Sequence, residues 1–147
     1  MRKKKIVVIG GGTGIPVILD SLRKEDVELT AIVTVADDGG SSGKLRGTLD
    51  IAPPGDLRNV LVAMSDMPRV YGQIFQYRFR AEDGPLSGHP IGNLVIAGVS
   101  EMQGSTYNAL KILSKFFHVQ GRILPSSESA LTLHAVFKDK TEIIGES

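Results

Sequence analysis

The sequence predicts a three-layer α/β fold built around a mostly parallel sheet. A β-branched run, Lys5–Ile9, ends in a glycine cluster, a helical segment covers Ile15–Lys24, and a second β-branched run spans Glu28–Val35. Strand, glycine turn, helix and strand in this order form a βαβ unit, whose right-handed crossover makes the two strands parallel. Because parallel strands are normally covered on both faces, we expect the first strand to be buried.

The first predicted helix has residues typical of a helix start and a helix end, whereas the segment after the second strand has no pattern of a helix or strand. Pro16 lies near the first turn of the helix, and Arg23 and Lys24 lie near its end, where the helix dipole favours cations. The polar, glycine-rich segment Ala36–Gly55 shows no hydrophobic periodicity. The sequence therefore predicts a long loop there, and such a loop is either functional or disordered.

Helices are predicted for the middle of the chain. Asp56 is placed to cap a helix over Leu57–Met64. A second helix is expected over Val70–Phe79, with Ile74 and Phe75 facing inward beside its two terminal residues.

The last third of the chain is predicted to mix helices and strands. A loop, Ala81–Gly92, leads into a helix over Asn93–Met102, and Ser105 or Thr106 caps the next helix. The apolar stripe of that helix is expected in the core and comprises Ala109, Ile112, Leu113, Phe116 and Phe117. Strands are predicted at Arg122–Leu124, Ala130–Phe137 and Thr141–Ile144, with a turn at Lys138–Lys140.

The composition limits the class of protein. The 147 residues suit one domain with a real core, and 41% apolar with 22% charged residues is typical of a globular chain. A net charge of +1 and an aromatic content of 5% argue against a nucleic-acid partner. The lack of cysteine excludes disulfides, thiolate metal sites and a cysteine nucleophile. Because the apolar runs are too short for a signal peptide or a membrane span, we expect a cytoplasmic protein without membrane insertion.

The glycine cluster Gly10–Gly14 is the first candidate site. Glycines let backbone N–H groups approach an anion closely, and the helix N-terminus behind them adds unpaired donors and a positive dipole end. The dinucleotide fingerprint places a third glycine where this chain has Ile15, and the terminal Lys-Ser/Thr of a P-loop is missing. The cluster could serve only tight strand-to-helix packing, but its position favours phosphate binding.

Two aspartates follow the second strand. Asp37 is spaced from the glycines as the acidic residue that bonds ribose hydroxyls in dinucleotide-binding folds. Asp37 and Asp38 together could instead hold Mg²⁺ beside a phosphate, or could simply cap the N–H groups of a turn. Chemistry alone leaves these alternatives open.

Further polar residues lie in the segments that follow. The run from Gly39 to Arg46 offers backbone donors, two hydroxyls and two cations, which together suit a diphosphate. Arg58 could bind an acidic ligand or pair with Asp56. His89 lies in a loop ahead of a helix and has the side chain best suited to proton transfer near neutral pH. His118 and His134 are expected to be structural, and no nucleophile–base pair is identifiable.

Seven motifs in order resemble the YvcK proteins, the bacterial gluconeogenesis factors related to the 2-phospho-L-lactate transferase CofD. They are GGGTG, VADDGGSSGKLR, PPGDLRN, FQYRF, LSGHPIGN, GRILPSS and the closing GES. Each alone is weakly specific, but the ordered set covers nearly the whole chain. The Ser-Ser-Gly after the aspartates and the Pro-Pro-Gly-Asp-Leu-Arg-Asn segment resemble the YvcK branch more than the transferase branch.

The resemblance implies a Rossmann-like fold and a regulatory protein that binds a nucleotide sugar such as UDP-N-acetylglucosamine, with NAD-like ligands in the same cleft. It also implies support of cell shape and wall synthesis during gluconeogenic growth. No cofactor is required on this view, and a homo-oligomer is left open. The ligand-binding positions it implies are Gly10, Gly11, Gly12, Thr13, Gly14, Asp37, Asp38, Ser41, Ser42, Asp56, Arg58, Asn59, His89 and Asn93.

Two rival functions follow from the same motifs. A CofD-like transferase would join a phospholactyl group to a deazaflavin alcohol, with Asp37 and Asp38 holding Mg²⁺. A GTP-binding polymer subunit would share GGGTG with tubulin-like proteins, but here Ile15 and Pro16 follow that motif. Because members of the resembled family are considerably longer, we expect residues 1–147 to be the N-terminal part of such a domain, truncated.

Overall fold

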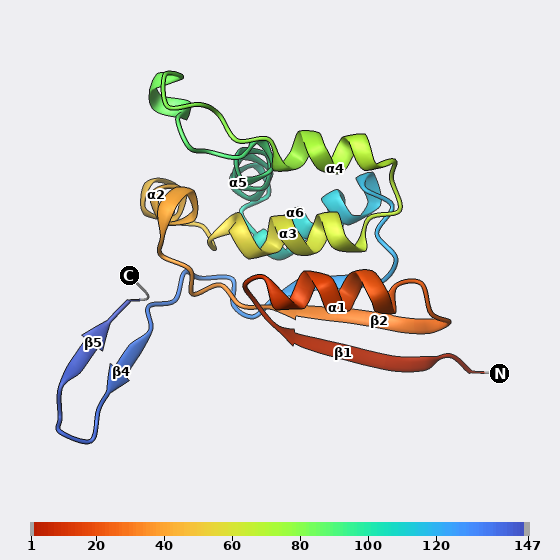
Figure 1. The fold of residues 1–147 in the computed structure, drawn as a ribbon, viewed down its shortest axis with the longest axis horizontal. Coiled ribbons are helices and arrows are strands. Elements are labelled where there is room, and N and C mark those ends of the chain that lie inside the picture. Colours follow the sequence, from red (N-terminus) through yellow and green to blue (C-terminus); the bar gives the residue numbers. More distant parts are fainter. Residues whose placement is uncertain (1, 146–147) are drawn as a thin grey trace.

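Three parallel strands form the sheet of this protein, for which the computed structural model describes residues 2–145 (Figure 1). They are β1 (Lys4–Gly10), β2 (Val27–Val33) and β3 (Arg122–Pro125), in the spatial order β1-β2-β3. The register pairs Val7 with Thr30 and Ile9 with Ile32. β2 therefore lies in the middle, although β1 comes first in the sequence.

The first helix, α1 (Gly14–Leu22), connects β1 to β2 as the βαβ unit requires. Its buried residues Ile15 and Leu19 pack into the core, whereas Val17 and Ile18 on its other side are exposed. The α/β class and the parallel sheet predicted from the sequence are confirmed.

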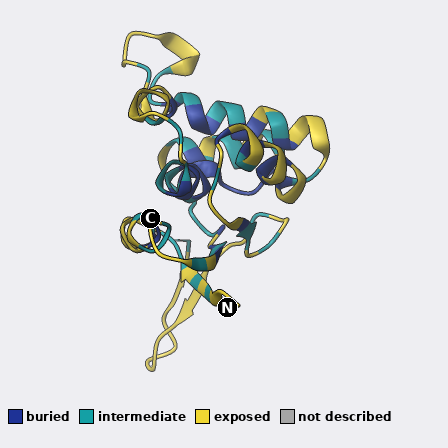
Figure 2. Cartoon of the chain, turned by 90° about the vertical axis from the view of Figure 1, so that its right-hand side faces the viewer, coloured by how far each residue is buried: buried dark blue, intermediate teal, exposed yellow. Residues whose placement is uncertain are grey.

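The remaining helices lie with α1 on one side of the sheet (Figure 1). They are α2 (Gly40–Leu49), α3 (Pro54–Met64), α4 (Arg69–Gln76), the 3₁₀ turn η1 (Gly84–Leu86), α5 (Ile91–Gln103) and α6 (Thr106–Phe116). The core forms where α1, α3 and α6 pack on the sheet and α5 packs on α3 and α6, and Figure 2 shows it as the dark centre of the helical layer. None of the helices described in residues 2–145 is long and apolar enough to cross a bilayer.

The predicted loop over Ala36–Gly55 is wrong, because α2 lies inside it. Its sequence has too few apolar residues and too many glycines to show a helical period. Tertiary contacts hold it instead: Ser42 Oγ accepts a hydrogen bond from the Gly55 N–H at 3.1 Å, and the Arg46 guanidinium donates to the Leu131 carbonyl at 3.0 Å. Asp50, with φ of 49°, ends the helix in the left-handed conformation.

Two predicted inward faces are wrong in part. Val70 and Ile74 of the predicted inward face around α4 are exposed while Phe75 is buried. On α6, Ile112 and Phe116 are exposed while Leu110 takes a core position outside the predicted stripe. Each helix packs on one side only, so an apolar residue next to the stripe can face outward. Asp56 is likewise not the cap of α3, because that helix begins at Pro54 and Asp56 lies in its first turn.

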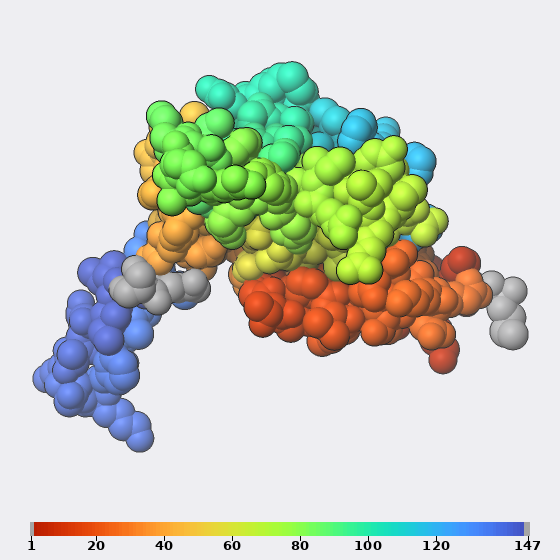
Figure 3. Space-filling view, turned by 45° about the horizontal axis from the view of Figure 1, so that its top comes forward, coloured from red at the N-terminus to blue at the C-terminus, as the bar shows by residue number. Residues whose placement is uncertain are grey.

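The end of the described chain is a two-stranded antiparallel hairpin, β4 (His134–Val136) and β5 (Glu142–Ile144). It stands away from the helical layer and the sheet (Figure 3), and all six of its strand residues are exposed. The strand predicted over Ala130–Phe137 is therefore much shorter in the structure, while the turn at Lys138–Lys140 is confirmed, with Lys140 at φ of 67°.

The face of the sheet opposite the helices is uncovered among residues 2–145. The register places Val7 and Ile9 of β1 on that face beside Thr30 and Ile32 of β2. Val7 is 56% exposed and Ile9 is 72% exposed, so the expectation that β1 is buried is wrong. Its other side chains, Ile6 and Val8, pack against the core as expected.

Candidate functional site

The glycine cluster forms the turn between β1 and α1. Gly12 has a positive φ of 65°, and a Cβ placed on Gly12 or Gly14 would meet nothing within 4 Å. A Cβ on Gly11 would overlap Thr34 Oγ1 and lie 2.5 Å from Asp56 Oδ2. A side chain at Gly11 would therefore have to displace the Thr34 hydroxyl and the Asp56 carboxylate, whereas Gly12 and Gly14 line open space.

The N-terminus of α1 has no side-chain cap. Its N-cap residue Thr13 makes no capping hydrogen bond, and the first turn contains no acidic residue. The first N–H groups of a helix lack intrahelical partners and carry the positive end of the dipole. This end of α1 is therefore suited to bind an anion that the protein itself does not supply.

The N-terminus of α2 also lacks an N-cap side chain, but a carboxylate of the protein already lies at it. Its N-cap residue Gly39 offers no side chain, and its first turn carries Ser41 and Ser42 with no acidic residue. Asp37 Oδ1 accepts a hydrogen bond from the Gly39 N–H at 3.0 Å, so this carboxylate fixes the entry into the helix. Asp37 thus caps a backbone N–H group of the turn, which was one of the roles considered for it from the sequence.

The start of α3 links these two helix ends. Asp56 lies against Gly11, and Gly55 donates its N–H to Ser42 Oγ. The first of these contacts lies where β1 and β2 end, because Thr34 directly follows β2 and its N–H donates to the Gly10 carbonyl at 2.9 Å. The start of α3 therefore contacts the glycine turn before α1 and the first turn of α2.

A hydrogen-bonded network adjoins the start of α2. Ser41 Oγ lies 2.8 Å from His89 Nδ1 and accepts a hydrogen bond from Asn93 Nδ2 at 3.0 Å. Because Asn93 donates to this oxygen, we assign the Ser41 hydroxyl as donor to a neutral His89 ring. Burial, followed by the charges of Lys44 and Arg78, lowers the pKa of His89 and favours that neutral form.

Arg58 extends the network into the helical layer. Its guanidinium donates to Asn93 Oδ1 at 2.6 Å, to Gln76 Oε1 at 2.7 Å and to Asn59 Oδ1 at 3.1 Å. Burial lowers the pKa of Arg58, with a further contribution from Arg78, while the carboxylates of Asp56 and Asp37 oppose the shift. Arg58 is buried and makes no salt bridge with Asp56, so that sequence-based alternative is not what the structure shows.

The structure brings most of the predicted site residues together, but Asp38 and Arg46 have other neighbours. Asp38 lies against Gly145 and Gly43 rather than against the glycine turn. Arg46, expected as a cation for a diphosphate, donates to the carbonyls of Ala36, Asp37 and Leu131. Of the two cations in that segment, only Lys44 remains exposed.

Two residues of the site were missed by sequence reasoning. Thr34 approaches Asp56 with its hydroxyl at 3.4 Å, and Gln76 joins Arg58 to Asn59. Gln76 lies in the FQYRF motif, which could have drawn attention to it. Within residues 2–145 no three His, Asp or Glu side chains gather as a metal-binding group.

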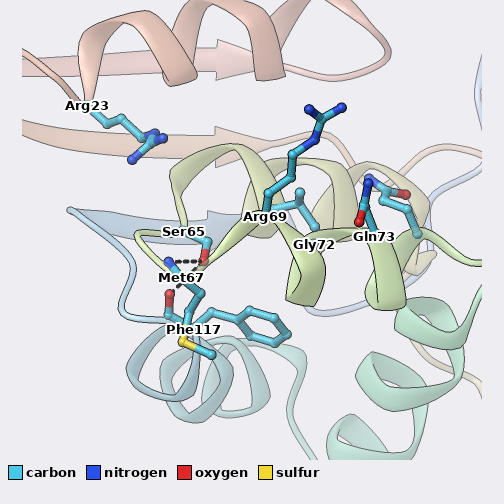
Figure 4. A pocket seen from close by; sticks show the side chains of 9 residues that line it. Arg23, Ser65, Met67, Arg69, Gly72, Gln73 and Phe117 are labelled. Atoms are coloured by element: carbon cyan, nitrogen blue, oxygen red, sulfur yellow. Dashed lines mark hydrogen bonds between the residues drawn. The ribbon is translucent and has the colours of Figure 1, made fainter.

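One hollow of the described chain lies away from the glycine turn. Figure 4 shows that hollow, of about 390 Å³, near the C-terminal end of α1 between Arg23, Ser65, Arg69 and Phe117. Gln76 also lines it. We place the candidate site at the glycine turn, because the uncapped N-terminus of α1 lies there and a phosphate needs donors more than enclosure.

Comparison with known proteins places the chain among bacterial relatives. Residues 6–147 match a family model described as 2-phospho-L-lactate transferase CofD. A Streptococcus pyogenes protein named "Putative gluconeogenesis factor" is 69% identical over 147 residues, which cover 100% of this chain and 45% of the relative. The "Gluconeogenesis factor" of Listeria monocytogenes is 51% identical over 99% of this chain and 45% of its own length.

A solved structure agrees with these sequence matches. The crystal structure of a Bacillus halodurans protein aligns with a TM-score of 0.92 at 50% identity, over 97% of this chain and 46% of that one. The chain thus spans less than half the length of the relatives it matches.

Proposed function

Since this chain belongs to the CofD family, we propose that the carboxyl edge of its sheet binds the diphosphate of a nucleotide sugar of the UDP-N-acetylglucosamine type. One observation carries the proposal. The N-termini of α1 and α2 both neighbour the start of α3, through Gly11 beside Asp56 and Ser42 beside Gly55, and neither has an N-cap side chain or an acidic residue in its first turn. A diphosphate carries two anionic groups, which suits two sets of unpaired N–H donors.

The groups around the two helix ends suit the rest of such a ligand. Asp56 and the exposed Thr34 offer an acceptor and a hydroxyl beside Gly11, where ribose or sugar hydroxyls would bind. Lys44 on the outer face of α2 would add a cation beside the phosphates. The network of Ser41, His89 and Asn93 holds the first turn of α2 in place.

For the cell, we propose a regulatory role that supports cell shape and wall synthesis during gluconeogenic growth. The names of the streptococcal and listerial relatives, gluconeogenesis factors, support the metabolic part of this proposal. A nucleotide sugar is a precursor of wall polymers, so a protein that senses one could link carbon supply to wall synthesis. We place it in the cytoplasm, where such precursors are made.

A transferase activity is the rival function, because the description of the family model names one. It would place Mg²⁺ near Asp37 and Asp38, whose carboxyl groups are the type of ligand that this cation prefers. Asp37 already accepts the Gly39 N–H, and Asp38 lies against Gly145, so these two side chains point to different neighbours. This arrangement favours the binding role over the transferase.

Calorimetry tests the proposed ligand. UDP-N-acetylglucosamine is titrated into a polypeptide of the relatives' full length that contains residues 1–147. We expect saturable heat and at least tenfold weaker binding for Gly14→Val, because its side chain would enter the open space at the N-terminus of α1. Gly98→Val, at an equally open glycine of α5, is the matched control. No heat at millimolar ligand, or equal loss in both variants, contradicts the proposal, and turnover with Mg²⁺ would favour the transferase.

A further inference from the structure

The hollow shown in Figure 4 lies between the end of α1 and the start of α4, apart from the glycine turn. Its volume of about 390 Å³ is within the range of small-molecule sites. Nine described residues line it, of which two are arginines, Arg23 and Arg69, and none carries a carboxylate. Because the charged groups of this lining are all positive, the hollow is suited to an anion.

The two arginines come from different helices and reach into the space between them (Figure 4). Arg23 directly follows α1, and its Nε donates to Asp20 Oδ1 at 3.0 Å, whereas its Nη1 lies 3.6 Å from Asp66 Oδ1, beyond hydrogen-bond range. Arg69 begins α4, is exposed and forms no ion pair with another described side chain. The guanidinium of Arg69 and part of that of Arg23 are therefore available to a ligand.

The polar walls of the hollow are held in place by the protein itself. Gln76 Oε1 accepts a hydrogen bond from the buried Arg58 at 2.7 Å. Ser65 Oγ donates to the Phe117 carbonyl at 2.8 Å and accepts from the Met67 N–H at 3.1 Å. A site whose side chains are already ordered loses less conformational entropy on binding, so these contacts favour a ligand there.

Another part of the lining is apolar. It consists of Val62, Met67 and Phe117, and the Phe117 ring packs against Phe75 with the ring centroids 4.6 Å apart. An inorganic ion would leave these apolar groups in contact with water, whereas a carbon skeleton would cover them. The hollow therefore combines cationic and apolar groups, as a site for a small organic anion requires.

We propose that this hollow is a second ligand site, which binds a small organic phosphate monoester. The phosphate group lies between Arg23 and Arg69, and the carbon skeleton lies on Met67 and Phe117. A phosphate monoester carries about two negative charges near neutral pH, which matches two guanidinium groups, and arginine often binds phosphate oxygens through two parallel hydrogen bonds. A carboxylate brings only one charge. This site does not depend on the binding of a nucleotide sugar at the glycine turn.

Phenyl phosphate is the probe, because it joins a phosphate monoester to an apolar ring. It is titrated into the isotopically labelled 147-residue chain, and the amide chemical shifts in NMR spectra locate where it binds. We expect saturable shifts of Gly72 and Gln73, which line the hollow. Inorganic phosphate, which lacks the ring, and benzoate, which brings one charge, should each bind there at least tenfold more weakly. Shifts of Gly12 and Gly14 report on the glycine turn, so this test and that of the proposed function have separate outcomes.

A pair of arginine variants tests the role of the charge. Arg69→Gln should weaken the binding of phenyl phosphate at the hollow at least tenfold and leave any shifts of the glycine turn unchanged. Arg80→Gln, at an exposed arginine that does not line the hollow, is the matched control and should change neither. Circular dichroism checks the fold of both variants.

Three results would overturn the proposal. The first is that Gly72 and Gln73 do not shift at millimolar phenyl phosphate. The second is that benzoate or inorganic phosphate binds at the hollow as tightly as phenyl phosphate does. The third is that Arg80→Gln weakens binding as much as Arg69→Gln does.

Discussion

Arg58 Nη1 donates to Asn93 Oδ1 at 2.6 Å, and both side chains are buried. The two residues lie 35 positions apart, on α3 and α5, and Asn93 passes the contact on to Ser41 at the start of α2. One guanidinium therefore fixes the helix end that we propose for anion binding. A planar fork with several donors suits this role in a way that an ammonium does not.

We expect Arg58→Lys to destabilise the fold by about 2–3 kcal/mol, because a lysine cannot donate to Asn93, Gln76 and Asn59 together and the Asn93 acceptor is buried. Urea unfolding monitored by circular dichroism measures the free energy. Arg80→Lys, at an exposed arginine, is the control and should change little. Equal stability of the two variants would show that the network does not hold the helices together.

The stability of the fold should depend on the charge of His89. Burial lowers the pKa of His89 below its ordinary value of 6.5, so the unfolded chain takes up a proton at a higher pH than the folded chain does. The contribution of the neutral ring is therefore complete above about pH 6.5 and is lost as the pH falls toward the folded pKa.

His89→Asn removes this titration and keeps an acceptor for the Ser41 hydroxyl. Urea unfolding at pH 7.5 and 5.5 should show that the unaltered chain loses more free energy of unfolding than the variant. His118, His134 and the carboxyl groups remain in both proteins, so their effects cancel in the comparison. A loss of the same size in both proteins would exclude the buried imidazole as its source.

Gly11 and Gly14 should respond oppositely to alanine. Gly11→Ala should cost about 1 kcal/mol, because the added Cβ overlaps the ends of the Thr34 and Asp56 side chains, which must rotate away and lose their mutual contact. Gly14→Ala should be neutral or slightly stabilising, since it meets open space at the start of α1. Thermal unfolding of the two variants measures the difference, and a neutral Gly11→Ala would mean that the Thr34 and Asp56 side chains move aside at no cost.

Glu128 should stabilise α6 from outside the helix. Its carboxylate accepts from the N–H groups of Thr106 at 2.9 Å and Tyr107 at 3.1 Å, and from Ser105 Oγ at 3.1 Å. Glu128→Gln should cost about 1 kcal/mol and less at high salt, because the residue is exposed and its charge is screened.

Hydrogen exchange in the first turn of α6 measures this effect most directly. Exchange of the Thr106 and Tyr107 amides should speed up in Glu128→Gln, whereas Glu82→Gln, at an exposed glutamate near η1, should leave it unchanged. An effect that does not shrink in salt would argue that the charge of Glu128 is not its cause.

The sequence predicted those strands and helices whose residues show a hydrophobic period over a short stretch of chain. The β-branched run around Val8 and the helix around Leu19 were found because strand and helix periods are visible over a few residues. α2 could not be found, since Ser42 and Arg46 hold it through partners far along the chain. The outward position of Phe116 was missed for a related reason, because the sequence does not show which side of a helix has a neighbour.

The candidate site divides in the same way. The glycine turn and Asp56 follow from their place in a strand–turn–helix order, and the structure brings them together. The contact between Ser41 and His89 joins residues 48 positions apart, and no spacing rule predicts it. Composition could not show that the Arg46 guanidinium donates to backbone carbonyls and not to a ligand. That contact depends on residues 131 and 132 lying beside α2, which only the folded chain shows.

The strand order has a consequence for how the molecule forms. β1, α1 and β2 are complete once 33 residues have been made, but the second neighbour of β2 is β3, which begins at Arg122. Bringing β3 to β2 closes the long segment between them, which costs conformational entropy before the hydrogen bonds of the strand pair form. Non-local pairing of this kind slows folding. A ribosome-bound chain would therefore hold β2 open on one side while residues 34–121 are made. That interval is when a chaperone, or a neighbouring nascent chain, would find the strand first.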